Sequence, residues 1–366
     1  MAITIPVVWS DACLLHDPGG EVFVGVRTPG TEVAERALEI RRALEGAGAP
    51  FVDAAPHDDG AVLAVHDKRL VEFLSGAWDA WQASGLEADP GQDRVVPYVF
   101  HLPGVTSGRV PLEPAATWAR TGLYAYDTMT LIGPGTWSAA RAATDAALTA
   151  ADLAASSRAA YACCRPPGHH ATRATYGGSC YLNNAAIAAQ RLCDGGFGRV
   201  AVIDIDAHHG NGTQEIFWER PDVFTGSVHV DPEAGWFPHF LGLGDEVGGE
   251  GAPGANLNVP LRPGAADDEW LAAVSSLCVA AAAHGVAAIV VALGVDAAGG
   301  DPESPLDVSE AGFREAGRLL GGLGVPTVVV QEGGYDLAAI GGLVLATLQG
   351  IEQGIEEGQR VGEQRG

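Results

Sequence analysis

The sequence predicts an α/β fold built on a mainly parallel β-sheet that helices flank on both faces. Several short runs are continuously apolar and rich in β-branched residues, as expected for strands buried on both sides. Alanine-rich stretches of helical length separate these runs, and this alternation is typical of right-handed strand–helix–strand crossovers. Polar residues also gather where several apolar runs end, which is where open α/β sheets carry their sites.

The elements follow one another along the chain. The expected strands are ITIPVVWS (3–10), RVAVIDID (199–206), DVFTGSVHV (222–230), AAIVVALGVD (287–296) and VPTVVVQEGGY (325–335). The expected helices are 138–157, 183–193, 268–284 and 309–321. The tail, residues 352–366, is expected to be frayed or to form a short exposed helix.

Residues 85–115 are rich in proline and glycine and are expected to form long surface loops. We do not interpret them as a linker, because the first half of the chain is needed to complete the sheet. The expectation is therefore a single catalytic domain spanning residues 1–366.

Composition narrows the classes of function. The formal net charge of the 366 residues is −25, which argues against nucleic acid as a partner and suits a cationic substrate. No apolar run is long enough to span a membrane, and the first residues do not resemble a signal peptide. The six scattered cysteines include no CxxC pair and are expected to be buried thiols. A cytoplasmic protein is expected.

Four apolar runs end in residues that can bind a metal or move a proton. They are His169 and His170, Asp206 and His208, Asp296, and Tyr335. Two carboxylates and one imidazole, from Asp206, Asp296 and His208, match a catalytic Zn²⁺ site with one open position. The Asp-x-His spacing suits an extended strand end, where residues i and i+2 point the same way. Fe²⁺ or Co²⁺ would fit similar ligands.

The remaining polar residues of these runs can transfer a proton, orient a histidine or donate a hydrogen bond. His169 and His170 follow the rigid sequence RPPG, which lets both imidazoles face one cavity, and one of them can act as a general base. Asp204 can orient one histidine at a bent strand end. Tyr335 follows two glycines in a tight turn, and its phenol is a plausible oxyanion donor.

With these residues in place, the chain resembles the histone deacetylase and acetylpolyamine amidohydrolase superfamily, and most closely its bacterial, class II-like members. The matching stretches are RPPGHHA, GGSCYLNNAAIAAQ, DIDAHHGNGTQEIF, WFPHFLG, LGVDAAGGDP and EGGY, which cover residues 161–336 densely. Residues 65–85 match more weakly. The resemblance implies the arginase–deacetylase fold, one domain with a central, mainly parallel, eight-stranded sheet, and a zinc-dependent deacetylase.

The resemblance also implies roles for single residues. The implied zinc ligands are Asp206, His208 and Asp296. The implied catalytic residues are His170 as base and then acid, His169 paired with Asp204, Asn211 orienting His170, and Tyr335 at the oxyanion. A structural K⁺ ion is implied at Asp204, Asp206, His208, Ser227 and the Val228 carbonyl. No role is transferred to His209.

Substrate recognition is read from the residues around this centre. Phe237 matches an aromatic wall of the acyl-lysine tunnel, but its usual partner after the two glycines is replaced by Ser179, which follows Gly178. The tunnel is therefore expected to be open or polar on that side and to admit bulkier substrates.

A cationic substrate is expected to meet acidic residues at the mouth of the pocket. Glu303 stands seven residues after Asp296. In the polyamine deacetylases that the chain resembles, a glutamate at this spacing lies at the pocket mouth and binds the distal ammonium of the substrate. Glu21 is a second candidate. Trp118 occupies the position where acetylpolyamine amidohydrolases carry another acidic residue.

Several alternatives stay open at this point. The substrate is expected to be an acetylpolyamine, with acetyl-lysine in proteins or another small acylated amine as the alternative. A two-Mn²⁺ ureohydrolase is disfavoured because Ala297 and Ala298 stand where its extra aspartate would be needed. A non-catalytic binding protein would not need both histidines and Tyr335. A homodimer is possible, with loops 10–30 and 95–120 shaping the entrance or the dimer contact.

Overall fold

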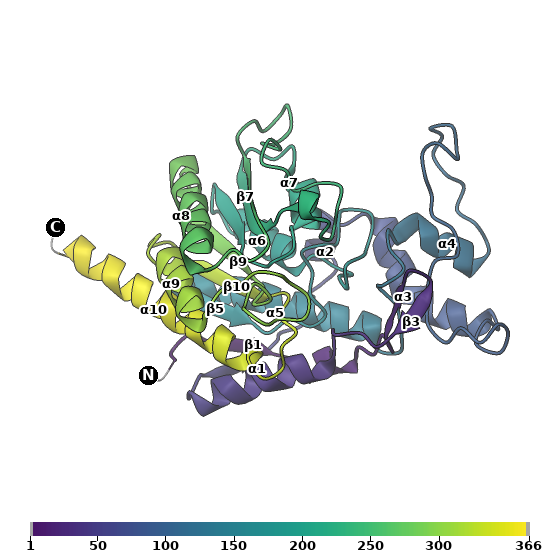
Figure 1. The fold of residues 1–366 in the computed structure, drawn as a ribbon, viewed down its shortest axis with the longest axis horizontal. Helices are drawn as coiled ribbons and strands as arrows, with labels where there is room; N and C mark the ends of the chain where they lie inside the picture. The colour runs from purple at the N-terminus through teal and green to yellow at the C-terminus, as the bar shows by residue number, and fades with distance from the viewer. Residues whose placement is uncertain (1–2, 364–366) are drawn as a thin grey trace.

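An eight-stranded parallel sheet forms the centre of the protein in the computed structural model, which describes residues 3–363 (Figure 1). Its strand order is β4-β1-β5-β10-β9-β6-β7-β8, and every neighbouring pair is parallel. The strands are β1 (Val7–Trp9), β4 (Phe51–Asp53), β5 (Ala159–Ala162), β6 (Val200–Asp204), β7 (Val223–Val230), β8 (Asn256–Leu261), β9 (Ala288–Leu293) and β10 (Thr327–Gln331). The predicted fold class is confirmed.

Helices cover both faces of this sheet, as the apolar strands require. Side chains of β9 alternate between the two faces: Ile289 and Val291 join one core, and Val290 joins the other. The first core is covered by α1 (Ala34–Gly46), α8 (Asp267–His284), α9 (Glu310–Gly321) and α10 (Ile340–Glu363). The second is covered by α2 (Gly60–Val65), α3 (Lys68–Ala83), α4 (Thr117–Tyr124), α5 (Thr136–Ser157), α6 (Asn184–Asp194) and α7 (Asn211–Phe217).

Three expectations about elements need correction. Residues 352–363 of the predicted tail are neither frayed nor a short helix, because they are the end of one long helix, α10, whose apolar side packs against α9 and α1. Residues 364–366 of that tail lie outside the described residues. Residues 10–30 are not simply a loop, because they contain the 3₁₀ helix η1 (Asp11–Leu15) and an antiparallel hairpin of β2 (Glu21–Phe23) and β3 (Val26–Thr28). Strands β4 and β8 were not anticipated. A second 3₁₀ helix, η2 (Pro232–Ala234), follows β7.

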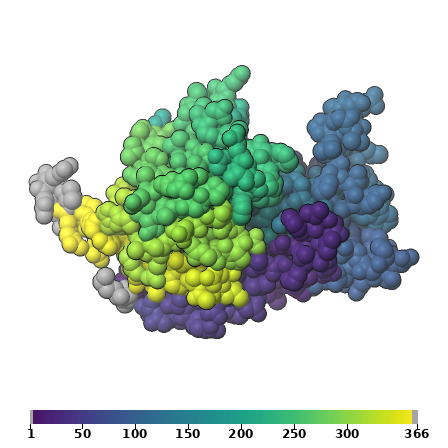
Figure 2. Space-filling model, viewed as in Figure 1, coloured from purple at the N-terminus to yellow at the C-terminus, as the bar shows by residue number. Residues whose placement is uncertain are grey.

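The proline- and glycine-rich segment between α3 and α4 extends away from the sheet (Figure 1). It contains no helix or strand between residues 85 and 115, as predicted. Several of its large apolar side chains are exposed to solvent: Tyr98, Val99, Leu102, Val105, Val110 and Leu112. In the space-filling view this segment belongs to the blue lobe at the right, beside the hairpin β2–β3 in dark purple (Figure 2). None of the helices in residues 3–363 is long and apolar enough to cross a membrane.

Candidate active site

The sheet itself brings the predicted site residues together. The strands β5, β10, β9 and β6 are consecutive in the sheet, and because they are parallel, their carboxyl ends meet at one edge. The segments after these four strands carry the two histidines, Tyr335, Asp296, and the pair Asp206 and His208. Residues that are far apart in the sequence therefore line one pocket.

The three predicted metal ligands form a compact cluster. The Nδ1 atom of His208 lies 3.1 Å from Asp206 Oδ1 and 3.0 Å from Asp296 Oδ2. One ligand atom from each residue lies within 4.8 Å of the other two. The side chains of Asp206 and Asp296 are completely buried. The structure thus assembles two carboxylate oxygens and one imidazole nitrogen around one point.

The local geometry of the Asp-x-His segment differs from the expected extended strand end. Strand β6 already ends at Asp204, and residues 206–208 bend. The bend forms because Asp206 Oδ1 accepts a hydrogen bond from the His208 backbone N–H at 2.9 Å, as in an Asx-turn. The Asp206 side chain therefore stabilises the turn that follows it, and this turn determines the position of His208.

These residues fit a divalent cation. Burial raises the pKa of Asp296 to about 7, and the neighbouring Asp206 carboxylate adds to the rise. A cation bound between two buried carboxylates offsets this cost. The second oxygen of each carboxylate is held by backbone: Gly333 N–H donates to Asp206 Oδ2 and Ala207 N–H donates to Asp296 Oδ1. The oxygens nearest His208 remain for a metal. Oxygen and imidazole donors of this kind match Zn²⁺.

The two histidines have different partners and different charges. His169 Nδ1 lies 2.9 Å from Asp204 Oδ2. Burial lowers the pKa of His169, but the carboxylates of Asp204 and Asp206 outweigh this effect and raise the pKa to about 10. The structure thus brings His169 and Asp204 into contact, which is the pairing that the family resemblance implied.

His170 is the neutral histidine of the pair. Burial lowers its pKa well below the usual value, and the adjacent His169 and His208 lower it further. Its Nδ1 atom lies 2.7 Å from the amide oxygen of Asn211. Because an amide oxygen can only accept, Nδ1 carries the hydrogen and Nε2 presents a lone pair. A neutral imidazole oriented in this way can accept a proton from water.

Tyr335 lines the same pocket and is held by two residues that sequence reasoning missed. The Arg36 guanidinium stacks 4.6 Å from the centre of its ring and donates to the carbonyl oxygens of Gly334 and Glu332. Asp301 Oδ2 accepts the Tyr335 backbone N–H at 2.8 Å. Both contacts fix the turn from which the phenol projects.

Glu332 is a further residue that the sequence analysis did not single out. Its Oε2 atom accepts backbone N–H groups of Gly168 and His169 at 2.6 and 3.1 Å, which fixes the loop that carries both histidines. Burial raises its pKa to about 7. The available signal was an acidic residue at the end of an apolar strand, in QEGGY.

The pocket above these groups has a volume of about 70 Å³. Its lining joins catalytic and predicted substrate residues: Glu21, Thr31, Met129, His170, Gly178, Ser179, His208, Phe237, Glu303 and Tyr335. Phe237 packs edge-on against His170, with ring centres 4.9 Å apart. A Cβ atom on Gly178 would lie 2.4 Å from His170 Cδ2, so glycine is required there. Ser179 follows with a positive φ of 62°.

The acidic residues predicted at the pocket mouth come from two separate segments. Glu21 lies on β2, and Glu303 lies in the loop that follows Asp296; both side chains are half-buried. Thr31, which was not anticipated, donates its hydroxyl to Glu303 Oε1 at 2.8 Å. Trp118 lies on α4 and is not among the residues that line the pocket.

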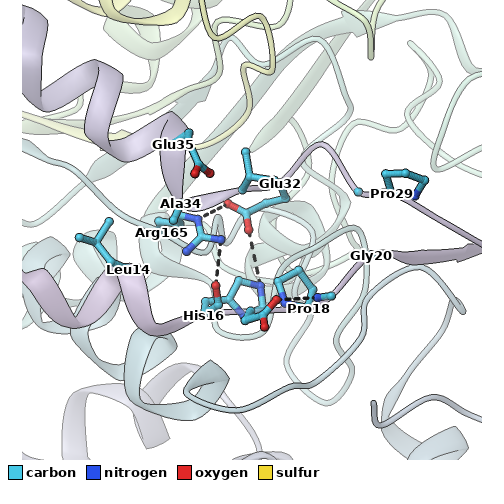
Figure 3. Close-up of a pocket in the computed structure, with 13 residues that line it drawn as sticks. Leu14, His16, Pro18, Gly20, Pro29, Glu32, Ala34, Glu35 and Arg165 are labelled. Atoms are coloured by element: carbon cyan, nitrogen blue, oxygen red, sulfur yellow. Dashed lines mark hydrogen bonds and ion pairs between the residues drawn. The ribbon is translucent and has the colours of Figure 1, made fainter. Parts of the chain in front are cut away.

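A second cavity of about 420 Å³ lies behind this acidic mouth (Figure 3). Gly30 and Glu32 line the second cavity, whereas Thr31 between them lines the active pocket. Glu32 is buried and paired through Oε1 with both Arg36 and Arg165 at 2.9 Å. The segment that carries Thr31 is therefore a wall between two cavities, anchored by buried ion pairs.

The residues predicted to hold K⁺ lie where β6 and β7 pair, with Asp204 opposite Ser227 in the register. Ser227 Oγ lies 2.8 Å from His229 Nδ1. His209, to which no role was transferred, is buried, with Nε2 3.1 Å from Gln214 Oε1 and its ring against that of His229. Its contacts are those of a core residue.

Comparison with known proteins identifies the family to which these residues belong. The sequence profile of the histone deacetylase domain matches residues 31–351. The chain belongs to the histone deacetylase family. The match covers every residue that was predicted as a metal ligand or an acid–base group.

Relatives within this family match nearly the whole chain. An acetylpolyamine amidohydrolase of Mycoplana ramosa is 41% identical over 347 residues, which are 94% of this chain and 99% of the relative. Acetylpolyamine amidohydrolase 1 of Pseudomonas aeruginosa is 40% identical over 348 residues, 94% and 98% of the two chains. The crystal structure of an acetylpolyamine aminohydrolase from Burkholderia pseudomallei superposes with a TM-score of 0.89 at 34% identity, covering 96% of this chain and 99% of that one.

Proposed function

We propose that this member of the histone deacetylase family is a zinc-dependent amidohydrolase that removes the acetyl group from an N-acetylated primary amine, an acetylpolyamine in the first instance. The observation that carries the proposal is the meeting of three metal-ligand side chains, a neutral histidine and a tyrosine in one pocket. Two relatives that match almost end to end are named acetylpolyamine amidohydrolases, which supports the substrate class.

In this proposal Asp206, His208 and Asp296 hold Zn²⁺. When bound, the ion would polarise the scissile carbonyl and make a water molecule more acidic. A K⁺ ion at Asp204, Asp206, His208, Ser227 and the Val228 carbonyl is a further part of the proposal. It would brace the strand ends from behind the catalytic centre.

The chain's own residues then perform the proton transfers. His170 Nε2 takes a proton from the attacking water and later gives it to the leaving amine. His169, held as an imidazolium by Asp204, adds positive charge beside the reacting carbonyl. The Tyr335 hydroxyl donates a hydrogen bond to the oxygen on which negative charge develops. Phe237 excludes water from one side of the acyl chain.

A cationic amine is the proposed substrate because the mouth of the pocket carries the carboxyl groups of Glu21 and Glu303. The net charge of −25 would also draw a polyamine towards the surface. A carboxylate facing an ammonium at a partly wet site contributes about 1–4 kcal/mol, enough to set a preference.

Replacement of Glu303 tests this proposal. Glu303→Leu is expected to lower kcat/KM for acetylputrescine and acetylspermidine about tenfold or more, and to leave a neutral acetyl-lysine peptide unchanged or improved. Glu303→Gln, which keeps the size and removes the charge, is the matched control and should behave like Glu303→Leu. If both substrates respond alike, or if the wild type ignores acetylpolyamines, a protein or small-molecule deacylase takes the place of the polyamine enzyme.

The proposal extends to assembly and location. We place the enzyme in the cytoplasm, where its six cysteines would stay as the free thiols that they are here. We also propose a homodimer in which the exposed apolar side chains of loop 95–120 and of the hairpin tip, including Leu112 and Val24, meet a second copy. Leu112→Glu should then shift the molar mass in light scattering towards that of a monomer.

A further inference from the structure

The two carboxyl groups at the pocket mouth are linked by one residue. Thr31 donates its hydroxyl to Glu303 Oε1 at 2.8 Å. Its backbone N–H also interacts with the Glu21 carboxylate. Glu21 and Glu303 thus belong to different segments, a hairpin strand and a loop after β9, and Thr31 contacts both.

Thr31 is well fixed for such a role. The next residue, Glu32, is buried and paired with Arg36 and Arg165, and it closes the cavity on the far side of the segment (Figure 3). Glu303 is fixed independently of Thr31: its N–H donates to Asp301 Oδ1 at 2.9 Å, and its carbonyl accepts from Trp236 Nε1 at 3.1 Å. The bridge therefore joins two rigid supports.

We infer that Thr31 is a positioning residue that holds Glu21 and Glu303 together as one paired receptor for the distal ammonium of the substrate. The inference rests on the proposed function, since it takes the substrate to be a cationic amine. Two like charges held close together are costly until a cation lies between them, so the pair rewards a positively charged substrate and rejects a neutral one.

The surroundings of Glu21 make the charge of this receptor depend on pH. Besides Glu303, the charges of Asp127 and of Glu32 across the wall act on Glu21. His170 and His208 lie at the floor of the same pocket. The nearest hairpin cation, Arg27, is instead engaged with Asp93 and the Gly19 carbonyl. Burial and then the charge of Glu303 raise the pKa of Glu21 to about 7, and the Thr31 backbone only partly opposes the rise.

The sign of the pH dependence follows from this. Below pH 7 Glu21 is protonated in the free enzyme and contributes no charge to the receptor. Above pH 7 it is ionised and attracts the ammonium. The KM of a cationic substrate should therefore fall as the pH rises through about 7. Binding below this pH should release a proton.

The test compares N-acetylputrescine with N-acetylpentylamine, in which a methyl group replaces the distal ammonium. The ratio of their kcat/KM values cancels the ionisations of the catalytic histidines, which both substrates share. In the wild type this ratio should rise between pH 6 and 8, and Glu21→Gln should abolish the rise.

Thr31→Val removes the hydroxyl at nearly constant shape, and Thr31→Ser is the matched control that keeps it. Thr31→Val should lower kcat/KM for N-acetylputrescine about tenfold, mainly through KM, because one hydrogen bond to a charged group is lost. N-acetylpentylamine should change less than twofold, about the smallest difference that such kinetics resolve. The midpoint of the pH-dependent ratio should also move to lower pH, because Glu303 is no longer held beside Glu21. Thr31→Ser should match the wild type in all three readouts.

The outcomes separate this inference from the proposed function. If Glu303→Leu fails to discriminate between the two substrates, the cationic-substrate proposal itself fails. If Glu303→Leu does discriminate but Thr31→Val behaves like Thr31→Ser, or leaves the midpoint unchanged, the positioning role of Thr31 is overturned and the substrate assignment stands. Equal melting temperatures of the two Thr31 variants establish that folding does not cause the difference.

Discussion

The floor and the rim of the active pocket are built in different ways. At the floor, Asp204 ends a central strand, and Asp206 and Asp296 follow central strands. All three are buried and accept hydrogen bonds from neighbouring backbone. At the rim, Glu21 and Glu303 are half-buried and lie on a hairpin and a loop outside the main sheet. In the function proposed above, the sheet supplies the groups that hydrolyse the amide, and the peripheral segments select the amine.

Charged groups at the floor and at the rim also differ in how much their loss of a partner costs in free energy. An unpaired charge at a dry floor is costly, so each floor carboxylate depends on its partners, and removal of one leaves the others uncompensated. A charge at the wet rim is screened and can be replaced with less damage. Substitutions should therefore have large, all-or-none effects at the floor and graded, substrate-dependent effects at the rim.

The largest expected effect is at the metal ligands. Asp296→Ala should abolish both metal binding and turnover, because it removes one of three ligands and leaves Asp206 and His208 without their partner. The metal content of purified protein and the deacetylation rate would be measured together. Asp268→Ala, an exposed aspartate on α8, is the control and should keep both. Two tightly bound Mn²⁺ ions per wild-type chain would contradict a single catalytic zinc.

The oxyanion donor should come next. Tyr335→Phe should reduce kcat by about 10²–10³ with little change in KM, since one donor to a developing oxyanion is lost while the ring and its contact with Arg36 remain. The loss should be the same for a polyamine and a peptide substrate, as befits a floor residue. A near-native rate would mean that another group stabilises the oxyanion.

Ser179 allows a smaller, substrate-dependent effect to be tested at the wall of the pocket. Ser179→Phe should narrow the tunnel and lower kcat/KM for branched acyl amines several-fold more than for N-acetylputrescine, about 1 kcal/mol of discrimination. Ser179→Ala is the control, because it meets the same backbone strain at φ 62° without the added bulk. An equal loss on all substrates would show strain and not a narrower tunnel.

The floor was largely predictable from sequence, and the rim only in part. The residues proposed as metal ligands and acid–base groups stand in compact motifs after apolar runs. The sequence could therefore indicate that Asp206, His208 and Asp296 would lie together, as they do. Thr31 and Asp301 could not be predicted in this way, because their partners, Glu303 and Tyr335, are distant from them in the sequence. Only the packed structure reveals such long-range hydrogen bonds.

The fold shows the same division. Strands with continuous β-branched residues, such as β9 and β10, were predicted, whereas β4 has three residues and β8 contains Pro260 and two asparagines. Both lie at the edges of the sheet, where the apolar signal is weakest. The helix α10 was underestimated because its glycines suggest fraying, and its packing against α9 outweighs their low helix propensity.

The strand order also determines when the enzyme can become active during its synthesis. Asp206 leaves the ribosome long before Asp296, and β10, which lies between β9 and β5 and precedes Tyr335, is made later still. At roughly 5–20 residues per second, the nascent chain spends several seconds with its first two metal ligands but not the third. If the proposed three-ligand site is correct, turnover has to wait until Asp296 and Tyr335 have been made and β9 and β10 have taken their places in the sheet.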